Sequence, residues 1–110
     1  ADQPVNPELN ISVSVAIQSK KAGKNTFAWA VATVDTGLDG ATVSGHWTDV
    51  TADLDSGVTA ADGTVTLQSD QVKLTGSEVT FTFIVDQVSK DGITYDLTGT
   101  TWASGTYSPG

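Results

Sequence analysis

Apolar and polar residues alternate with a period of two through most of the chain. Between residues 11 and 18 every second side chain is valine or isoleucine, and the residues between them are serine, alanine and glutamine. Residues 79–85 repeat the pattern, with Val79, Phe81, Phe83 and Val85 at every second position. Such alternation predicts β-strands that bury one face and expose the other.

The segment 27–32 alternates two kinds of apolar residue instead of apolar and polar ones. Phe27, Trp29 and Val31 occupy one set of positions, and three alanines occupy the other. Because burying large apolar side chains removes more surface from water, we predict that the phenylalanine, tryptophan and valine face the interior. The alanines are then expected to face outward or to lie beneath a neighbouring segment.

Further short strands are predicted at 41–47, 65–67, 93–95 and 100–107, whereas 49–57 and 69–77 look irregular. In the first of these, Val43 and Trp47 share an inward face and His46 points outward. Turn-forming sequences recur roughly every 8–12 residues, and no segment has helical periodicity. We therefore predict an all-β protein, an antiparallel β-sandwich of about seven strands. Its expected interior consists of Phe27, Trp29, Val43, Trp47, Phe81 and Phe83.

Three segments carry motifs that resemble a known class of domain. They are DTGLDGATVSGHW at 35–47, TAADGTVTL at 59–67, and VTFTFIVDQV at 79–88 followed by GITYD at 92–96. This pattern resembles bacterial immunoglobulin-like modules, broadly akin to fibronectin type III domains, over roughly residues 26–96. The resemblance implies an immunoglobulin-like sandwich. This chain departs from the pattern after Asp96, because its residues 97–107 continue beyond the point where such modules often end.

The same resemblance implies a function. Such modules are appended to secreted proteases, glycan-degrading enzymes and surface proteins. The expectation is therefore a non-catalytic accessory module of a secreted or cell-surface protein, acting as a spacer, a stabiliser or an adhesion unit. Its expected partners are the neighbouring domains of the same polypeptide. We predict one domain at 10–107, between linker-like segments at 1–9 and 108–110 that contain the prolines.

Charge and composition narrow the choice of partners. The chain of 110 residues carries 13 acidic and 5 basic side chains, a formal net charge of −8. Such a charge repels phosphate backbones and anionic lipid, so neither a nucleic acid nor a membrane is an expected partner. No apolar run approaches the ~20 residues of a membrane-spanning helix. Charged residues make up only 16%, below the usual quarter, which is typical of extracellular bacterial domains.

The residues offer little for catalysis or metal binding. There is no cysteine, His46 is the single histidine, and no G-x-S-x-G motif occurs, so an enzyme is not expected. One histidine cannot supply a zinc site. Asp53, Asp55, Asp35 and Asp39 lie in predicted loops, and carboxylates suit calcium. They match no EF-hand pattern, so we predict no cofactor and keep a calcium-stabilised module as a minority hypothesis.

Two aromatic residues near the end of the chain are the best candidates for a binding site. Trp102 and Tyr107 have no bulky residue two positions away, so they are expected to be exposed. Sugar rings stack their apolar C–H faces on such aromatic planes. The alternative function is therefore a carbohydrate-binding module with a polysaccharide as partner. A competing interpretation places Trp102 over the edge of the core.

Overall fold

The computed structural model describes residues 7–76 and 78–108. Most of the predicted linker-like ends, residues 1–6 and 109–110, therefore lies outside the described residues. The first strand begins at Glu8, slightly before the predicted domain start at residue 10. The described chain contains ten strands and no helix. The strands are β1 (Glu8–Ala22), β2 (Asn25–Asp35), β3 (Thr42–Asp49), β4 (Leu54–Val58), β5 (Thr64–Gln68), β6 (Val72–Lys73), β7 (Val79–Lys90), β8 (Ile93–Thr94), β9 (Asp96–Gly99) and β10 (Trp102–Tyr107).

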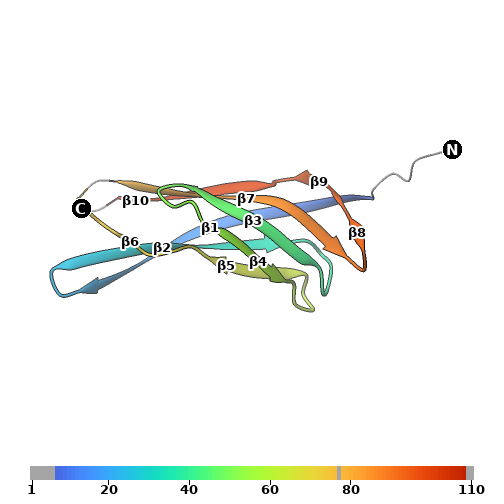
Figure 1. The fold of residues 1–110 in the computed structure, drawn as a ribbon, viewed down its shortest axis with the longest axis horizontal. Helices are drawn as coiled ribbons and strands as arrows, with labels where there is room; N and C mark the ends of the chain where they lie inside the picture. Colours follow the sequence, from blue (N-terminus) through green and yellow to red (C-terminus); the bar gives the residue numbers. More distant parts are fainter. Residues whose placement is uncertain (1–6, 77, 109–110) are drawn as a thin grey trace.

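The strands form two sheets that pack face to face into an elongated sandwich (Figure 1). The first sheet has the order β5-β2-β1-β9, with β6 also paired to β2. The second has the order β10-β7-β3-β4, with β8 also paired to β7. All pairings are antiparallel except β1 with β9, which is parallel from Glu8↔Asp96 to Ile11↔Gly99. The prediction of an all-β protein with two packed sheets is confirmed, but the sheets are mainly and not wholly antiparallel as predicted.

The interior is filled mainly by large side chains of the second sheet. Trp47 on β3 and both Phe81 and Phe83 on β7 are almost completely buried. The rings of Trp47 and Phe83 lie 4.9 Å apart at an angle of 55°, which is a favourable arrangement for two aromatic rings. Val43 is buried beside them, so the inward orientation predicted for these four residues is confirmed.

The prediction for β2 is wrong. Its buried face consists of Ala28, Ala30, Ala32 and Val34, whereas Phe27, Trp29 and Val31 lie half-buried on the outer face of the first sheet. The physical reason is space: packed sheets lie about 10 Å apart, and the aromatic residues of β3 and β7 already fill that gap. On the opposite sheet, β2 therefore has room only for small side chains such as those of its alanines.

The segment 49–57 is also more regular than predicted. Its second half belongs to β4, which pairs with β3 from Thr42↔Val58 to His46↔Leu54. Leu54, Ser56 and Val58 point to solvent, and Asp55 and Gly57 alternate with them. The only large apolar residues of β4 are Leu54 and Val58, and both face outward. The sequence of β4 therefore lacks the apolar residues at the inward positions by which a half-buried strand is predicted.

Candidate functional site

The outer face of the β10-β7-β3-β4 sheet carries one row of large side chains that crosses all four strands. His46 on β3 pairs with Leu54 on β4 and with Ile84 on β7. Ile84 in turn pairs with Trp102 on β10. Directly paired residues on one face have Cβ atoms about 4.5–5.5 Å apart, so the four side chains are contiguous. We call Leu54, His46, Ile84 and Trp102 the Trp102 row.

The two ends of the Trp102 row are the most exposed. Leu54 is 82% exposed and Trp102 is 57% exposed, whereas Ile84 and His46 between them are half-buried. The next row on the same face is polar, because Thr82 pairs with both Thr48 and Ser104. The result is a flat surface on which an aromatic ring and aliphatic groups lie beside hydroxyl groups.

A β-bulge places a carboxylate beside the Trp102 row. Ser44 pairs with Gln87 and Gly45 pairs with Val85, so Asp86 is the extra residue on β7. The bulge points its side chain at His46, with Nδ1 2.8 Å from Oδ2 of Asp86. Both side chains reach solvent, with exposures of 35% and 47%. Such an exposed pair contributes at most about 1 kcal/mol to stability, and it turns Nδ1 of the imidazole toward Asp86.

The structure separates the two aromatic residues singled out from the sequence. Trp102 lies on the outer face, whereas Tyr107, five positions later, lies half-buried on the opposite face of β10. That opposite face includes Gly105, which packs against Val15 and Ile17 of β1. The two rings therefore do not form one platform, and Trp102 alone joins the row.

Three members of the Trp102 row were not identified from the sequence as site residues. Ile84 shares its parity with Thr80 and Thr82, so its outward orientation was recoverable from the alternation in 79–85. His46 was expected to face outward. No sequence pattern identifies Leu54, because it lies in the segment 49–57, which has no regular alternation of apolar and polar residues. The row itself depends on the register between strands, which no local pattern specifies.

Comparisons with known protein families, curated proteins and solved structures find no match for this chain. The chemistry of its own residues is therefore the basis for a functional assignment. No helix with the length and hydropathy of a membrane span occurs in residues 7–76 and 78–108.

Of the acidic residues considered for calcium, Asp35 and Asp55 have other contacts, whereas Oδ1 of Asp53 is buried without a hydrogen-bond partner. Trp47 donates its indole N–H to Oδ2 of Asp55 at 2.8 Å. Burial raises the pKa of Asp55, and the negative charges of Asp53 and Asp70 add to that shift, while the bond from Trp47 opposes it. In the described part of the chain, no three histidine or acidic side chains come together as metal ligands. Calcium binding stays a hypothesis.

The Trp102 row lies on a surface and not in a cavity, since no pocket is found among residues 7–76 and 78–108. A flat surface of this kind suits an extended partner that lies across the strands. The exposed indole offers its π face, the aliphatic side chains extend the apolar area, and the neighbouring hydroxyl groups offer hydrogen bonds. This combination matches the chemistry of a sugar chain, which has apolar ring faces and hydroxyl-bearing edges.

Proposed function

We propose that the chain is an immunoglobulin-like sandwich of about seven principal strands. In that fold, strands A, B and E share one sheet, and strands G, F, C and C′ share the other. The neighbouring strands β1, β2 and β5 match A, B and E, and the order β10-β7-β3-β4 matches G, F, C and C′. This correspondence is the observation that supports the assignment. The short β6, β8 and β9 are additions to it.

We further propose that this fold serves as a non-catalytic accessory module of a secreted or cell-surface protein. The shape supports a spacer, because the principal axes extend 63 × 26 × 19 Å. β1 starts at one end of the long axis, and β10 finishes at the other (Figure 1). The low share of charged residues, 16%, supports an extracellular location. Neighbouring domains of the same polypeptide are the proposed partners.

A second candidate function, carbohydrate binding, is favoured by the 57% exposure of Trp102. A large aromatic side chain on a flat face, beside Ile84 and a row of hydroxyl groups, is the arrangement on which a neutral sugar ring stacks. In this form the module is an adhesion unit for a neutral polysaccharide. His46, whose Nδ1 is paired with Asp86 at the centre of the row, offers its other ring nitrogen, Nε2, as an acceptor for one sugar hydroxyl.

One experiment tests both functions. The chain is titrated calorimetrically with soluble neutral polysaccharides, and the same mixtures are assayed for released reducing ends. We expect no release of product, and binding that Trp102→Ala weakens about tenfold or more. Because Trp102 is largely exposed, this change should cost less than about 1 kcal/mol of stability. Val58→Ala, an exposed position on the outer face of β4 outside both the Trp102 row and the hydroxyl row, is the matched control and should bind normally.

The possible outcomes separate the two functions. Binding that is lost in Trp102→Ala but kept in Val58→Ala supports the adhesion unit. Absence of binding to every neutral glycan removes that function and leaves the spacer. Product release that disappears in His46→Gln would overturn the non-catalytic assignment, because His46, hydrogen-bonded to Asp86, is the single histidine of the chain.

A further inference from the structure

The opposite side of the molecule carries a second aromatic surface. Phe27, Trp29 and Val31 follow one another on the outer face of β2, with the buried alanines behind them. None of the three belongs to the hydrophobic core or packs against it. Large apolar side chains that a protein keeps in a contiguous patch outside its core commonly mark an interaction site.

The neighbouring strands place amines and amides on both sides of these rings. Phe27 pairs with Lys20 on β1 and with Lys73 on β6. Trp29 pairs with Gln18. We call Phe27, Trp29, Lys20, Lys73 and Gln18 the lysine–aromatic face.

Val31, the next outward residue of β2, extends the amide-bearing side of the lysine–aromatic face, since it pairs with Gln68 on β5. Phe27 is thus flanked by two positive charges, whereas Trp29 and Val31 each have one glutamine as a direct neighbour, Gln18 and Gln68 respectively.

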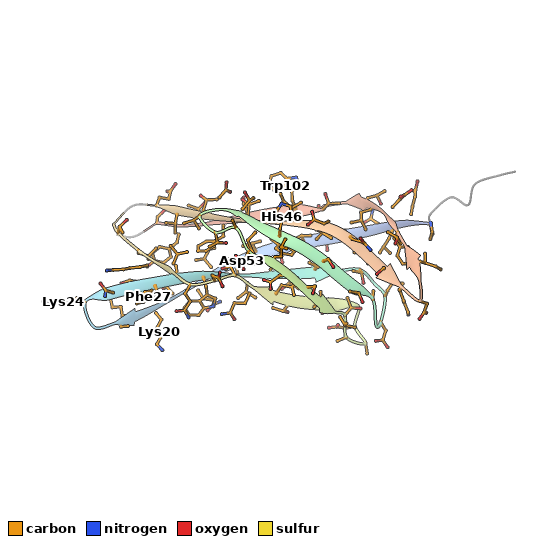
Figure 2. The ribbon with its side chains drawn as sticks, viewed as in Figure 1. Lys20, Lys24, Phe27, His46, Asp53 and Trp102 are labelled. Carbon is orange, nitrogen blue, oxygen red and sulfur yellow. The ribbon has the colours of Figure 1, made fainter. Side chains whose placement is uncertain are left out.

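The charge around Phe27 is opposite to that of the whole protein. Four of the five basic residues, Lys20, Lys21, Lys24 and Lys73, lie in or beside the hairpin of β1 and β2, and residues 9–34 contain no acidic residue. Among residues 7–76 and 78–108, no lysine forms an ion pair, the single pair being that of His46 with Asp86. Figure 2 shows Lys20, Lys24 and Phe27 together at the end of the molecule away from Trp102.

A positive patch of this size can act locally despite the net charge of −8. At physiological ionic strength the Debye length is about 8 Å. An anionic group that contacts Lys20 and Lys73 therefore senses these amines strongly. Carboxylates at the far end of a molecule 63 Å long are screened from it. The patch selects a partner that carries negative charge.

We propose that the lysine–aromatic face binds an acidic polysaccharide whose sugar units carry carboxylates. Sugar rings stack on Phe27 and Trp29, a carboxylate pairs with Lys20 and Lys73, and Gln18 and Gln68 hydrogen-bond hydroxyl groups further along the chain. This site lies on the other sheet from the Trp102 row and does not depend on the function proposed there.

The arrangement fits an acidic sugar chain better than other anions. Single-stranded nucleic acid needs positive charge along its whole backbone, whereas only the Phe27 position is flanked by lysines. An anionic membrane favours apolar side chains that protrude, whereas Phe27 and Trp29 are half-buried among their neighbours. Amides beside an aromatic ring suit uncharged hydroxyl groups, which a sugar chain provides between its carboxylates.

The test uses two matched probes, a galacturonic acid oligomer and its fully methyl-esterified form, which keeps the rings and removes the charge. Calorimetric titration of the unmodified chain should show binding of the acid that weakens as salt is added. The ester should bind about tenfold more weakly.

Matched variants then locate the site. Trp29→Ala, and separately the double change Lys20→Gln with Lys73→Gln, should each reduce affinity for the acid about tenfold. Lys90→Gln and Trp102→Ala should leave it unchanged, because both residues lie outside the face. All the substituted side chains lie away from the core, and melting temperatures within a few degrees of the unmodified protein check that the variants are folded.

Four results would overturn the proposal. They are no binding of the acid at low salt, equal binding of acid and ester, loss of binding in Trp102→Ala instead of Trp29→Ala, and tighter binding of a single-stranded oligonucleotide or of vesicles containing anionic lipid. Failure of the neutral-glycan experiment affects only Trp102, so the two proposals fail independently.

Discussion

Replacing Phe83 with alanine is expected to lower the free energy of unfolding by about 3–5 kcal/mol. Phe83 is completely buried on β7, and its ring packs at a tilt against that of Trp47. The substitution leaves a cavity between the sheets and removes the ring contact. Since domains of this size are stable by only about 5–15 kcal/mol, the variant is expected to be close to unfolding. Urea denaturation followed by fluorescence measures the change, and Phe83→Leu, expected to lose about 1–2 kcal/mol, keeps the test quantitative.

The matched control is Phe27→Ala, which removes the same ring from the outer face of β2. We expect a loss of about 1 kcal/mol, from contacts with cross-strand neighbours only. The comparison tests the orientation of β2 directly. Equal losses at the two positions would mean that Phe27 is also part of the core, and would contradict the packing described above.

The second large effect is expected at Gly45, in the middle of β3. A Cβ atom built there lies 2.5 Å from the ring of Phe83 and also collides with the backbone carbonyl of Ile84. The carbonyl cannot move without disturbing the pairing of β3 with β7. Gly45→Ala is therefore expected to cost about 1–3 kcal/mol or more, as overpacked cores do.

Gly105→Ala is the control for this substitution. Gly105 is also a strand glycine with an ordinary φ, but its new Cβ meets only the side-chain ends of Ile17 and Val15, at 3.0–3.2 Å. These ends can shift by a few tenths of an ångström. Thermal melting of both variants should therefore show the larger decrease for Gly45→Ala. A Gly45→Ala protein as stable as the unmodified chain would refute the close contact of β3 with β7.

The strands with clean alternation were predictable from the sequence, and β2 shows where that reasoning fails. For β1, β3 and β7, one face is apolar and the other polar, so burial follows directly from the pattern. Both faces of β2 are apolar, and the larger side chains lie on the outer face. Predicting the buried face from the size of the side chains therefore gave the wrong orientation. The sequence did contain a signal, because Val34 continues the parity of the alanines while Thr33 and Asp35 continue that of Phe27. The polar residues Thr33 and Asp35 at the end of β2 thus indicate the correct outward face, whereas the large side chains of Phe27 and Trp29 indicate the wrong one.

The remaining differences arise from contacts between distant segments. The parallel pairing of β9 with β1 joins residues that are far apart in sequence. The bulge at Asp86 appears only when β3 and β7 are aligned. The exposure of Trp102 could be expected from its polar neighbours. Its alignment with Ile84, His46 and Leu54 could not, because that alignment also depends on the pairing of distant strands.

The central claim is that β2 turns its alanines inward and thereby leaves an aromatic surface on each side of the sandwich. The accessibility of the three indole N–H groups to a soluble paramagnetic agent, measured by NMR, tests it most directly. We predict strong broadening for Trp102, clear broadening for Trp29, and none for Trp47, which is buried and bonded to Asp55. Protection of Trp29 equal to that of Trp47 would contradict the claim.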